Sequence, residues 1–90
     1  MQKPDIQYYK NGQIYAERYF LNDKFHKTNG PALVSYYENG QIKLAEYWIE
    51  GKRHNPNGPA YIQFCERDQI NLEYYINGRL QSVVHVVLND

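Results

Sequence analysis

Residues 8–32 read YYKNGQIYAERYFLNDKFHKTNGPA, and residues 36–60 read YYENGQIKLAEYWIEGKRHNPNGPA. The two segments align without a gap at a period of 28 residues, and 13 of the 25 aligned positions are identical. A third copy starts at Phe64 as FCERDQINLEYYINGRLQS, with one deletion and without the Gly-Pro-Ala end. Self-similarity at such a period is typical of repeat proteins, whose terminal units are commonly degenerate. We therefore expect a single domain, 1–90, with repeats at about 6–32, 34–60 and 62–82 and a last strand at 82–88.

Each copy has the pattern of a β-hairpin. Asn11-Gly12 and Asn39-Gly40 lie between Tyr and Ile residues, and Asn-Gly in this setting predicts a two-residue type I′ turn. Asn tolerates the first left-handed position of that turn, and Gly takes the second without Cβ strain. A second turn is expected after each outgoing strand, at 22–24, 50–52 and 77–79. The expected strands lie at about 5–10, 13–21, 31–37, 41–49, 59–65, 69–76 and 79–88.

The turns also predict which side chains share a face. With a two-residue turn, the cross-strand pairs of the second copy are Tyr37 with Ile42, Ser35 with Leu44, Tyr36 with Lys43, and Val34 with Ala45. Both faces of this ribbon then carry apolar side chains, unlike a sheet with one wet face. Such a sheet either curls on itself or is a single layer with Tyr rings on both faces. The simplest fold class is all-β, an antiparallel β-meander with one hairpin per repeat, about three in all.

A longer connection, His-x-x-Asn-Gly-Pro, follows the second turn in the first two copies. It contains His26 with Gly30 and Pro31, and His54 with Gly58 and Pro59. Pro lacks the N–H of a sheet ladder, so each Pro is expected at a strand start or edge. The two histidines lie two strands apart, about 10 Å in a regular meander, which is too far for a shared metal ion. We expect each imidazole to bond backbone groups of its own loop, and we expect no metal site.

Composition excludes several classes of protein. Ten basic and ten acidic residues give a formal net charge of zero, which argues against phosphate neutralisation and polybasic membrane binding. The longest apolar run, at 83–88, is far shorter than the roughly 20 residues that span a bilayer, and the first residues lack a signal-peptide core. The single cysteine, Cys65, fits a reducing compartment. These features predict a cytoplasmic protein, in the host cytoplasm if a virus or phage encodes it.

The sequence contains no convincing catalytic motif. Cys65 with a histidine would suggest a nucleophile and base, but it occupies the position of Tyr9 and Tyr37 and is expected to be a small apolar filler. Three glutamates lie on successive outgoing strands: Glu17, Glu46 and Glu73. They are expected to form a solvated row bridged to Lys or Arg, since paired catalytic carboxylates need a cleft. We expect no enzymatic activity and no cofactor, and a hydrolase using either loop histidine is the alternative.

Aromatic side chains point to a binding surface. The chain has ten Tyr, three Phe and one Trp, and aromatic residues and Arg are enriched at interface hot spots. The copies share their turn residues but differ at large side chains. Phe20 of the first copy corresponds to Trp48 in the second, and Phe25 corresponds to Arg53. The predicted protein-binding residues are Trp48, Arg53, Tyr47, Phe25 and Phe20. The last strand, 82–88, is apolar on both faces, so it is a candidate edge for a homodimer or for addition to a partner's sheet.

The pattern Tyr-Tyr-x-Asn-Gly-Gln-Ile, followed by Gly-Lys-x-His-x-x-Asn-Gly-Pro-Ala, resembles variants of the MORN-type repeat. The resemblance covers about residues 8–82, but the period of 28 is longer than that of the common unit. Such repeats occur in bacterial proteins described as antitoxin components and in large arrays of giant viruses. The resemblance implies MORN-like hairpin repeats that act as interaction or membrane-association modules without catalysis.

These observations predict a non-enzymatic module that binds another protein. The resemblance and the small size favour a stand-alone inhibitor, either antitoxin-like or an anti-defence protein of a phage or other mobile element, which blocks a larger enzyme or effector complex sterically. One alternative is a self-assembling scaffold of repeats. Another is a single-stranded nucleic-acid binder that uses Tyr rings as stacking platforms. Nucleic acid is disfavoured because acidic residues are interspersed with Arg18, Arg53, Arg67 and Arg79.

Overall fold

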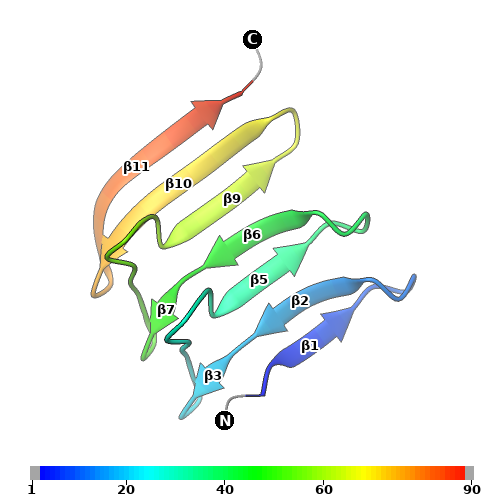
Figure 1. The fold of residues 1–90 in the computed structure, drawn as a ribbon, viewed down its shortest axis with the longest axis horizontal. Coiled ribbons are helices and arrows are strands. Elements are labelled where there is room, and N and C mark those ends of the chain that lie inside the picture. The colour runs from blue at the N-terminus through cyan, green and yellow to red at the C-terminus, as the bar shows by residue number, and fades with distance from the viewer. Residues whose placement is uncertain (1–2, 89–90) are drawn as a thin grey trace.

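One antiparallel sheet of seven strands organises the computed structural model, which describes residues 3–88 (Figure 1). Its strand order is β1-β2-β5-β6-β9-β10-β11, and two short hairpins, β3-β4 and β7-β8, extend from one end. The strands are β1 (Asp5–Tyr8), β2 (Ile14–Arg18), β3 (Phe20–Leu21), β4 (Lys24–Phe25), β5 (Leu33–Tyr36), β6 (Ile42–Glu46), β7 (Trp48–Ile49), β8 (Lys52–Arg53), β9 (Tyr61–Cys65), β10 (Gln69–Ile76) and β11 (Arg79–Val87). The predicted all-β antiparallel meander is confirmed. The predicted domain, 1–90, includes two residues at each end that lie outside the described range.

The described residues form strands and turns, and none of them belongs to a helix that could cross a membrane. The seven expected strands are found, and their bounds differ from the predicted ones by at most three residues. Two of them, 13–21 and 41–49, are interrupted at Tyr19 and Tyr47, where the chain leaves the large sheet and enters a short hairpin. The strands β4 and β8 were not predicted.

The Asn39-Gly40 turn differs from its prediction. The Gly40 N–H donates to the Tyr37 carbonyl (2.9 Å), and the Tyr37 N–H donates to the Gln41 carbonyl (2.8 Å), so three residues form the loop. Gly40 has a left-handed φ of 91°, whereas Asn39 is not left-handed. The Asn39 side chain instead accepts the Gln41 N–H at 2.9 Å. This is the three-residue hairpin loop that ends in a left-handed Gly, and the predicted type I′ turn is wrong here.

The Asn11-Gly12 loop has the same form. The Tyr9 N–H donates to the Gln13 carbonyl, and Gly12 has a φ of 88°. Two-residue turns with both residues left-handed do occur, but at the second turn of each copy: Asn22-Asp23, Glu50-Gly51 and Asn77-Gly78. The positions of the second turns were therefore predicted well, and the first turns were assigned one residue too short.

A β-bulge compensates for the longer loop. Tyr36 pairs with Ile42 and Ser35 pairs with Leu44, so Lys43 has no residue opposite it. The first copy has the same irregularity at Tyr15. In the third copy the pairing of β9 with β10 is continuous, so the deletion in the sequence alignment corresponds to the loss of this bulged residue. Because a bulge shifts one strand by one residue, it moves Ile42 to the face opposite to the predicted one.

The register divides the large sheet into two faces of different polarity. One face, called here the apolar face, carries two rows. The first is continuous across the sheet: Ile6, Glu17, Val34, Ala45, Ile62, Leu72, Val84. The second follows by alternation along the strands and consists of the pairs Tyr8–Ile14 and Tyr36–Ile42 and the set Phe64, Ile70, Val86. The other, called the polar face, carries Asp5, Arg18, Leu33, Glu46, Tyr61, Glu73, Val83; and Gln7, Ala16, Ser35, Leu44, Gln63, Asn71, His85. The alternation is cleaner than the sequence suggested.

The short hairpins form a second line of contacts between successive copies. The Lys27 N–H donates to the Trp48 carbonyl (3.1 Å), and the Gly51 N–H donates to the Phe25 carbonyl (2.9 Å). The next junction repeats this pattern, since the Gly78 N–H donates to the Arg53 carbonyl at 2.8 Å. The hairpins therefore continue the sheet at its lower end in Figure 1.

The loop histidines reach forward into the next copy. Nδ1 of His26 accepts the backbone N–H of Glu50 (2.9 Å), and Nδ1 of His54 accepts that of Asn77 (3.0 Å). Each imidazole was expected to fix its own loop, but these bonds instead hold the following type I′ turn. In a neutral ring, an accepting Nδ1 places the proton on Nε2.

Tyrosine hydroxyls provide a further connection. The Tyr9 hydroxyl donates to the Tyr36 carbonyl (2.7 Å), and the Tyr37 hydroxyl donates to the Phe64 carbonyl (2.6 Å). Donor and acceptor are 27 residues apart in both cases, so each Tyr bonds across to the next hairpin. The third copy has Cys65 at this position and has no equivalent hydroxyl.

The molecule is a single layer with a minimal interior. It measures 44 × 38 × 15 Å. The planes of two packed sheets are about 10 Å apart, and their outer side chains extend further on both sides, so a thickness of 15 Å fits one sheet with its side chains. Among the described residues, the buried hydrophobic side chains are alanines: Ala16, Ala32, Ala45 and Ala60. No large side chain in this range is fully buried. Stability therefore depends on contacts between neighbouring hairpins.

The bulge yields a prediction about deletions. Removing Lys43 gives the second copy the continuous pairing of the third, so we expect a folded protein whose free energy of unfolding changes by about 1 kcal/mol or less. Val34 lies on β5, which has no bulge. Removing it shifts the side chains that follow it on β5 to the wrong face and is expected to abolish cooperative unfolding. Thermal unfolding followed by circular dichroism measures both. Equal damage from the two deletions would contradict this account.

A second prediction concerns Tyr36. Its hydroxyl donates to Glu17 Oε2 at 2.7 Å, and this bond, together with burial, raises the pKa of Tyr36 to about 12. The pKa of an unfolded Tyr is about 10. The stabilisation is therefore complete below pH about 10 and is lost as the pH rises from about 10 through 12. We expect Tyr36→Phe and Glu17→Gln each to reduce this loss, measured as urea unfolding at a series of alkaline pH values. An unchanged pH dependence in both variants would contradict the assignment.

Candidate functional site: a row of aromatic side chains and an arginine

The two short hairpins align four large side chains on the polar face. Register places Phe20 opposite Phe25 and Trp48 opposite Arg53. The rings of Phe20 and Phe25 stack with centroids 4.9 Å apart, and Phe25 lies 5.5 Å from the Trp48 ring. The Arg53 guanidinium lies 5.2 Å from the Trp48 ring centroid. These four residues form a continuous line, called here the aromatic–arginine row.

Arg53 is anchored by a buried carboxylate. Its Nε and Nη2 donate to Glu46 Oε1 at 3.2 and 3.0 Å, and Trp48 Nε1 donates to the same oxygen at 3.1 Å. Glu46 is only 6% exposed, while 27% of the Arg53 side chain is exposed. A buried carboxylate that accepts three N–H bonds needs its cation, so Arg53 is held in one position.

A second carboxylate completes this cluster. Arg53 Nη1 donates to the Tyr75 hydroxyl (3.2 Å) and lies 3.8 Å from Glu73 Oε1. The Tyr75 hydroxyl donates to the same Glu73 oxygen at 2.7 Å. The guanidinium also lies 4.9 Å from the Tyr61 ring centroid and 5.3 Å from that of Tyr75. The arginine is therefore surrounded by aromatic faces and by two carboxylates from different hairpins.

The surroundings of Arg53, Tyr61 and Tyr75 raise the pKa of each of these three groups. Burial lowers the pKa of Arg53, but hydrogen bonds to Tyr75 and Glu46 outweigh it and leave that pKa raised. The hydrogen bond to Glu73, followed by burial, raises the pKa of Tyr75. Burial, followed by the charges of the two glutamates, raises the pKa of Tyr61. Both phenols are therefore neutral at physiological pH.

Four of the five predicted protein-binding residues lie together. Trp48, Arg53, Phe25 and Phe20 form the aromatic–arginine row, in which Phe20 is 38% exposed and the other three are partly buried. Tyr47 does not belong to the row. It precedes Trp48 on the same extended stretch, and alternation directs it to the opposite side of the sheet.

The three glutamates are not one solvated row. Glu17 lies on the apolar face, whereas Glu46 and Glu73 lie on the polar face with Arg53. The interpretation of a row bridged to arginine was partly correct for the last two. Its solvation was wrong for Glu46, which is buried. Glu17 was already one place out of register in the sequence alignment.

Cys65 is not paired with a base. Its Sγ accepts a hydrogen bond from Asn71 Nδ2 at 3.4 Å, and the Asn71 Oδ1 contacts His85 Nδ1. The asparagine therefore lies between the thiol and the imidazole, and Cys65 also borders a shallow hollow beside the loops at 38–41 and 66–68. Residues 3–88 also contain no group of three His, Cys, Asp or Glu side chains that could hold a metal ion.

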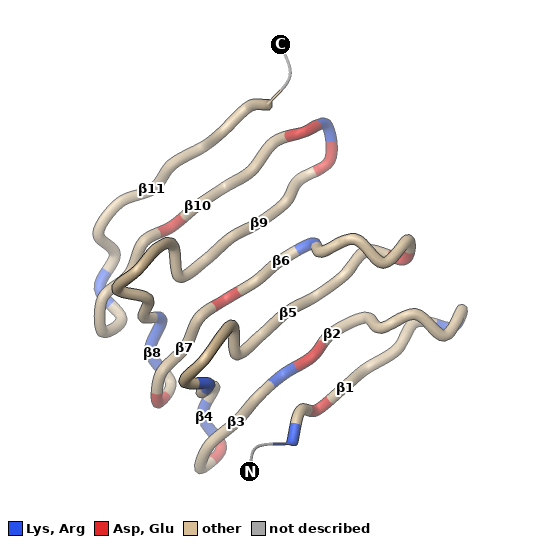
Figure 2. Tube along the Cα trace, viewed as in Figure 1, with Lys and Arg blue, Asp and Glu red and all other residues tan. Residues whose placement is uncertain are grey.

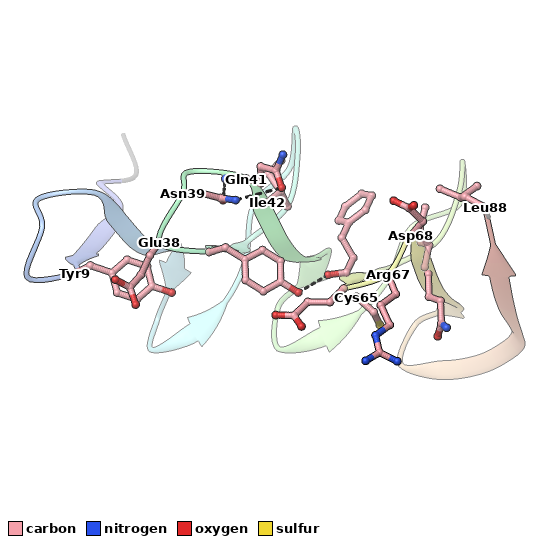
Figure 3. A pocket seen from close by; sticks show the side chains of 14 residues that line it. Tyr9, Glu38, Asn39, Gln41, Ile42, Cys65, Arg67, Asp68 and Leu88 are labelled. Carbon is pink, nitrogen blue, oxygen red and sulfur yellow. Dashed lines mark hydrogen bonds between the residues drawn. The ribbon is translucent and has the colours of Figure 1, made fainter. Parts of the chain in front are cut away.

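A shallow hollow of about 870 Å³ lies at the other end of the sheet, beside the loops at 38–41 and 66–68 (Figure 3). Its lining includes Tyr37, whose hydroxyl bonds the Phe64 carbonyl, and the Asn39 and Gln41 side chains, which bond each other. Charged groups of both signs border it, including Glu38 and Arg67. The Tyr37 contact connects two hairpins, the Asn39–Gln41 contact lies within one loop, and the hollow presents no convergent catalytic groups.

Charges of both signs lie near one another in this molecule. Figure 2 shows basic residues grouped at β4, β8 and the β10–β11 turn, with acidic residues in the short hairpin turns beside them, and no continuous basic stripe on the large sheet. Nucleic-acid sites normally add a positive groove to their aromatic platforms. The charge pattern of the described residues does not favour such a site.

Comparisons with protein-family models, with curated proteins and with solved structures give no match to this chain.

The link between Arg53 and three other members of the cluster was not predicted, although Glu46 and Glu73 were expected to be bridged to a Lys or Arg. Glu46, Glu73 and Tyr75 surround Arg53, yet they come from two copies of the repeat. The available signal was the Glu-Tyr pair shared by the second and third copies, followed by an aromatic residue at 48 and 75. The cluster itself depends on β8 lying beside the end of β10, which only the fold shows.

The cluster gives a stability prediction. Arg53→Leu leaves the Glu46 carboxylate buried without its cation, so we expect a loss of about 2 kcal/mol, below the cost for a fully buried pair because Arg53 is partly exposed. The double variant Glu46→Leu/Arg53→Leu removes both charges and is expected to recover most of that loss. Urea unfolding of the wild type, both single variants and the double variant measures the coupling. Additive losses would show that the two residues act independently.

Proposed function

We propose that this protein is a non-enzymatic binding module that acts on another protein in the cytoplasm. In its most specific form it is an inhibitor, antitoxin-like or an anti-defence factor of a mobile element, that blocks a larger enzyme or effector complex sterically. The resemblance to MORN-type repeats supports a module that binds without catalysis. A thin plate with only a shallow, open hollow is suited to covering the surface of a partner.

The observation that carries the proposal is the aromatic–arginine row. Its Phe, Trp and Arg groups follow one another at separations of 4.9–5.5 Å, and the buried Glu46 holds Trp48 and Arg53 by hydrogen bonds before any partner arrives. Pre-organised aromatic side chains lose little conformational entropy on binding. Hot spots of protein interfaces are rich in Trp and Arg. The row is also where the copies of the repeat differ, as expected where a constant frame presents variable contacts.

The test is capture of the partner from lysate of the source cells by tagged protein, followed by mass spectrometry. We expect one enzyme or effector complex in stoichiometric amount, and a loss of at least about 2 kcal/mol in its affinity for Phe20→Ala and Trp48→Ala. Arg53 is left intact because its loss would leave the buried Glu46 carboxylate without its cation. Val87→Ala, on a half-exposed side chain of the same face but far from the row, is the matched control. Folded row variants that bind like the control would disprove this site.

The edge strand supports a second candidate, a self-assembling module. β11 is the last strand of the sheet, and eight of its nine residues, Arg79–Val87, are exposed. An exposed edge of this length offers unpaired backbone groups to another strand. A homodimer through residues 82–88 would use this edge. Light scattering over a concentration range separates it from a monomeric inhibitor.

A further inference from the structure

The apolar face lies open although its composition is that of a buried surface. Its two rows hold fourteen residues, and Glu17 is the one charged residue among them. That carboxylate already accepts the Tyr36 hydroxyl. Several large side chains of the face are exposed: Tyr8 by 63%, Ile42 by 45%, Val84 by 39% and Phe64 by 36%. The opposite face has four charged side chains in one row, Asp5, Arg18, Glu46 and Glu73. An antiparallel sheet with this difference normally packs its apolar face against a second layer.

The described chain does not supply that layer. The short hairpins continue the sheet at its end, and the whole molecule is only 15 Å thick. Its accessible surface is 6381 Å², whereas a compact monomer of 10.7 kDa has roughly 5500 Å². The excess of roughly 900 Å² is close to the roughly 800 Å² that each partner buries in a standard interface.

We propose that a second copy of this chain covers the apolar face, so that two sheets pack face to face as a homodimer. Self-association requires only that the face be complementary to itself, and a nearly uncharged surface presents no like-charge repulsion at its centre. The chain has a formal net charge of zero, so long-range repulsion between copies is also absent. A charged partner protein would find no complementary charge in these two rows. Two apolar sheet faces about 10 Å apart are the ordinary arrangement of a β-sandwich.

This contact differs from the edge-to-edge homodimer through 82–88. An edge contact would lengthen the sheet and leave both apolar faces in water. A face contact removes those faces from water and leaves the aromatic–arginine row, which lies on the other face, accessible in both copies. The inference therefore stands independently of the partner proposed for that row.

Adjacent residues of β11 provide a matched test. Val84 lies on the apolar face opposite Leu72, and Val83 lies on the polar face opposite Glu73. Both are on the edge strand, both are exposed, and both become Glu in the variants Val84→Glu and Val83→Glu. A third variant, Ile42→Glu, tests the face far from the edge. Each charge would enter a two-fold interface twice.

Sedimentation equilibrium gives the mass of each protein over a range of concentrations. We expect wild type and Val83→Glu to reach twice the 10.7 kDa of one chain. Val84→Glu and Ile42→Glu should dissociate, with a dimer dissociation constant raised by at least about a hundredfold. Far-ultraviolet circular dichroism confirms that each variant is folded.

Three results would overturn the proposal. The first is a wild type that stays monomeric throughout, which would assign the apolar face to a different protein. The second is a Val84→Glu or Ile42→Glu variant that dimerises like the wild type. The third is dissociation of Val83→Glu to the same extent as Val84→Glu, which would place the contact at the β11 edge. Loss of partner capture alone, with the dimer intact, would contradict only the function proposed for the row.

Discussion

A single-layer sheet has almost no interior, and this constraint decides how the chain is held together. The fully buried positions are too small to form a hydrophobic core, since Ala32 and Ala60 are the residues with no exposed surface. Cohesion comes instead from bonds that each hairpin makes to the next. The Tyr hydroxyl at one end of the sheet and the His Nδ1 at the other fix the same pair of neighbours. Stability in such an array is a sum of nearest-neighbour terms, which is the energetic signature of a repeat protein.

Strand positions could be predicted because turn residues and β-forming residues alternate at a fixed period. The register near the first turn could not, because Asn-Gly suits two different loops. At Asn77-Gly78 both residues are left-handed, whereas at Asn39-Gly40 only the glycine is, and the Asn side chain bonds the following backbone. The bulge at Lys43 then restores the pairing from Ser35 onward. The error was therefore confined to a few residues, but it concealed the polarity of the two faces.

The candidate site was predicted in part for a similar reason. Comparing the copies identified Phe20, Phe25, Trp48 and Arg53, since residues at equivalent positions of a meander form a row across it. Tyr47 was grouped with them through proximity in sequence, although alternation places it on the other side. The sequence placed Glu46 and Glu73 in a row bridged to Lys or Arg but did not identify Arg53 as the cation. Glu46 meets Arg53 within one copy, two residues before Trp48 on the same face, whereas Glu73 meets it only through the contact between copies. Sequence periodicity locates residues along a strand, whereas the pairing of non-adjacent segments decides which charges meet.

The two proposed surfaces fit together because they lie on opposite faces. A face-to-face dimer would direct its two aromatic–arginine rows outward, away from each other. A single partner could not then engage both rows without wrapping around the plate, so the rows would bind one partner molecule each, and the complex would contain two of each protein. Dimerisation would raise avidity only toward a target that is itself oligomeric or clustered, since a second site adds affinity only where the geometry permits simultaneous engagement. The bulges at Tyr15 and Lys43 place Ile14 and Ile42 on the apolar face, so they would contribute both to the assembly and to the stoichiometry of binding.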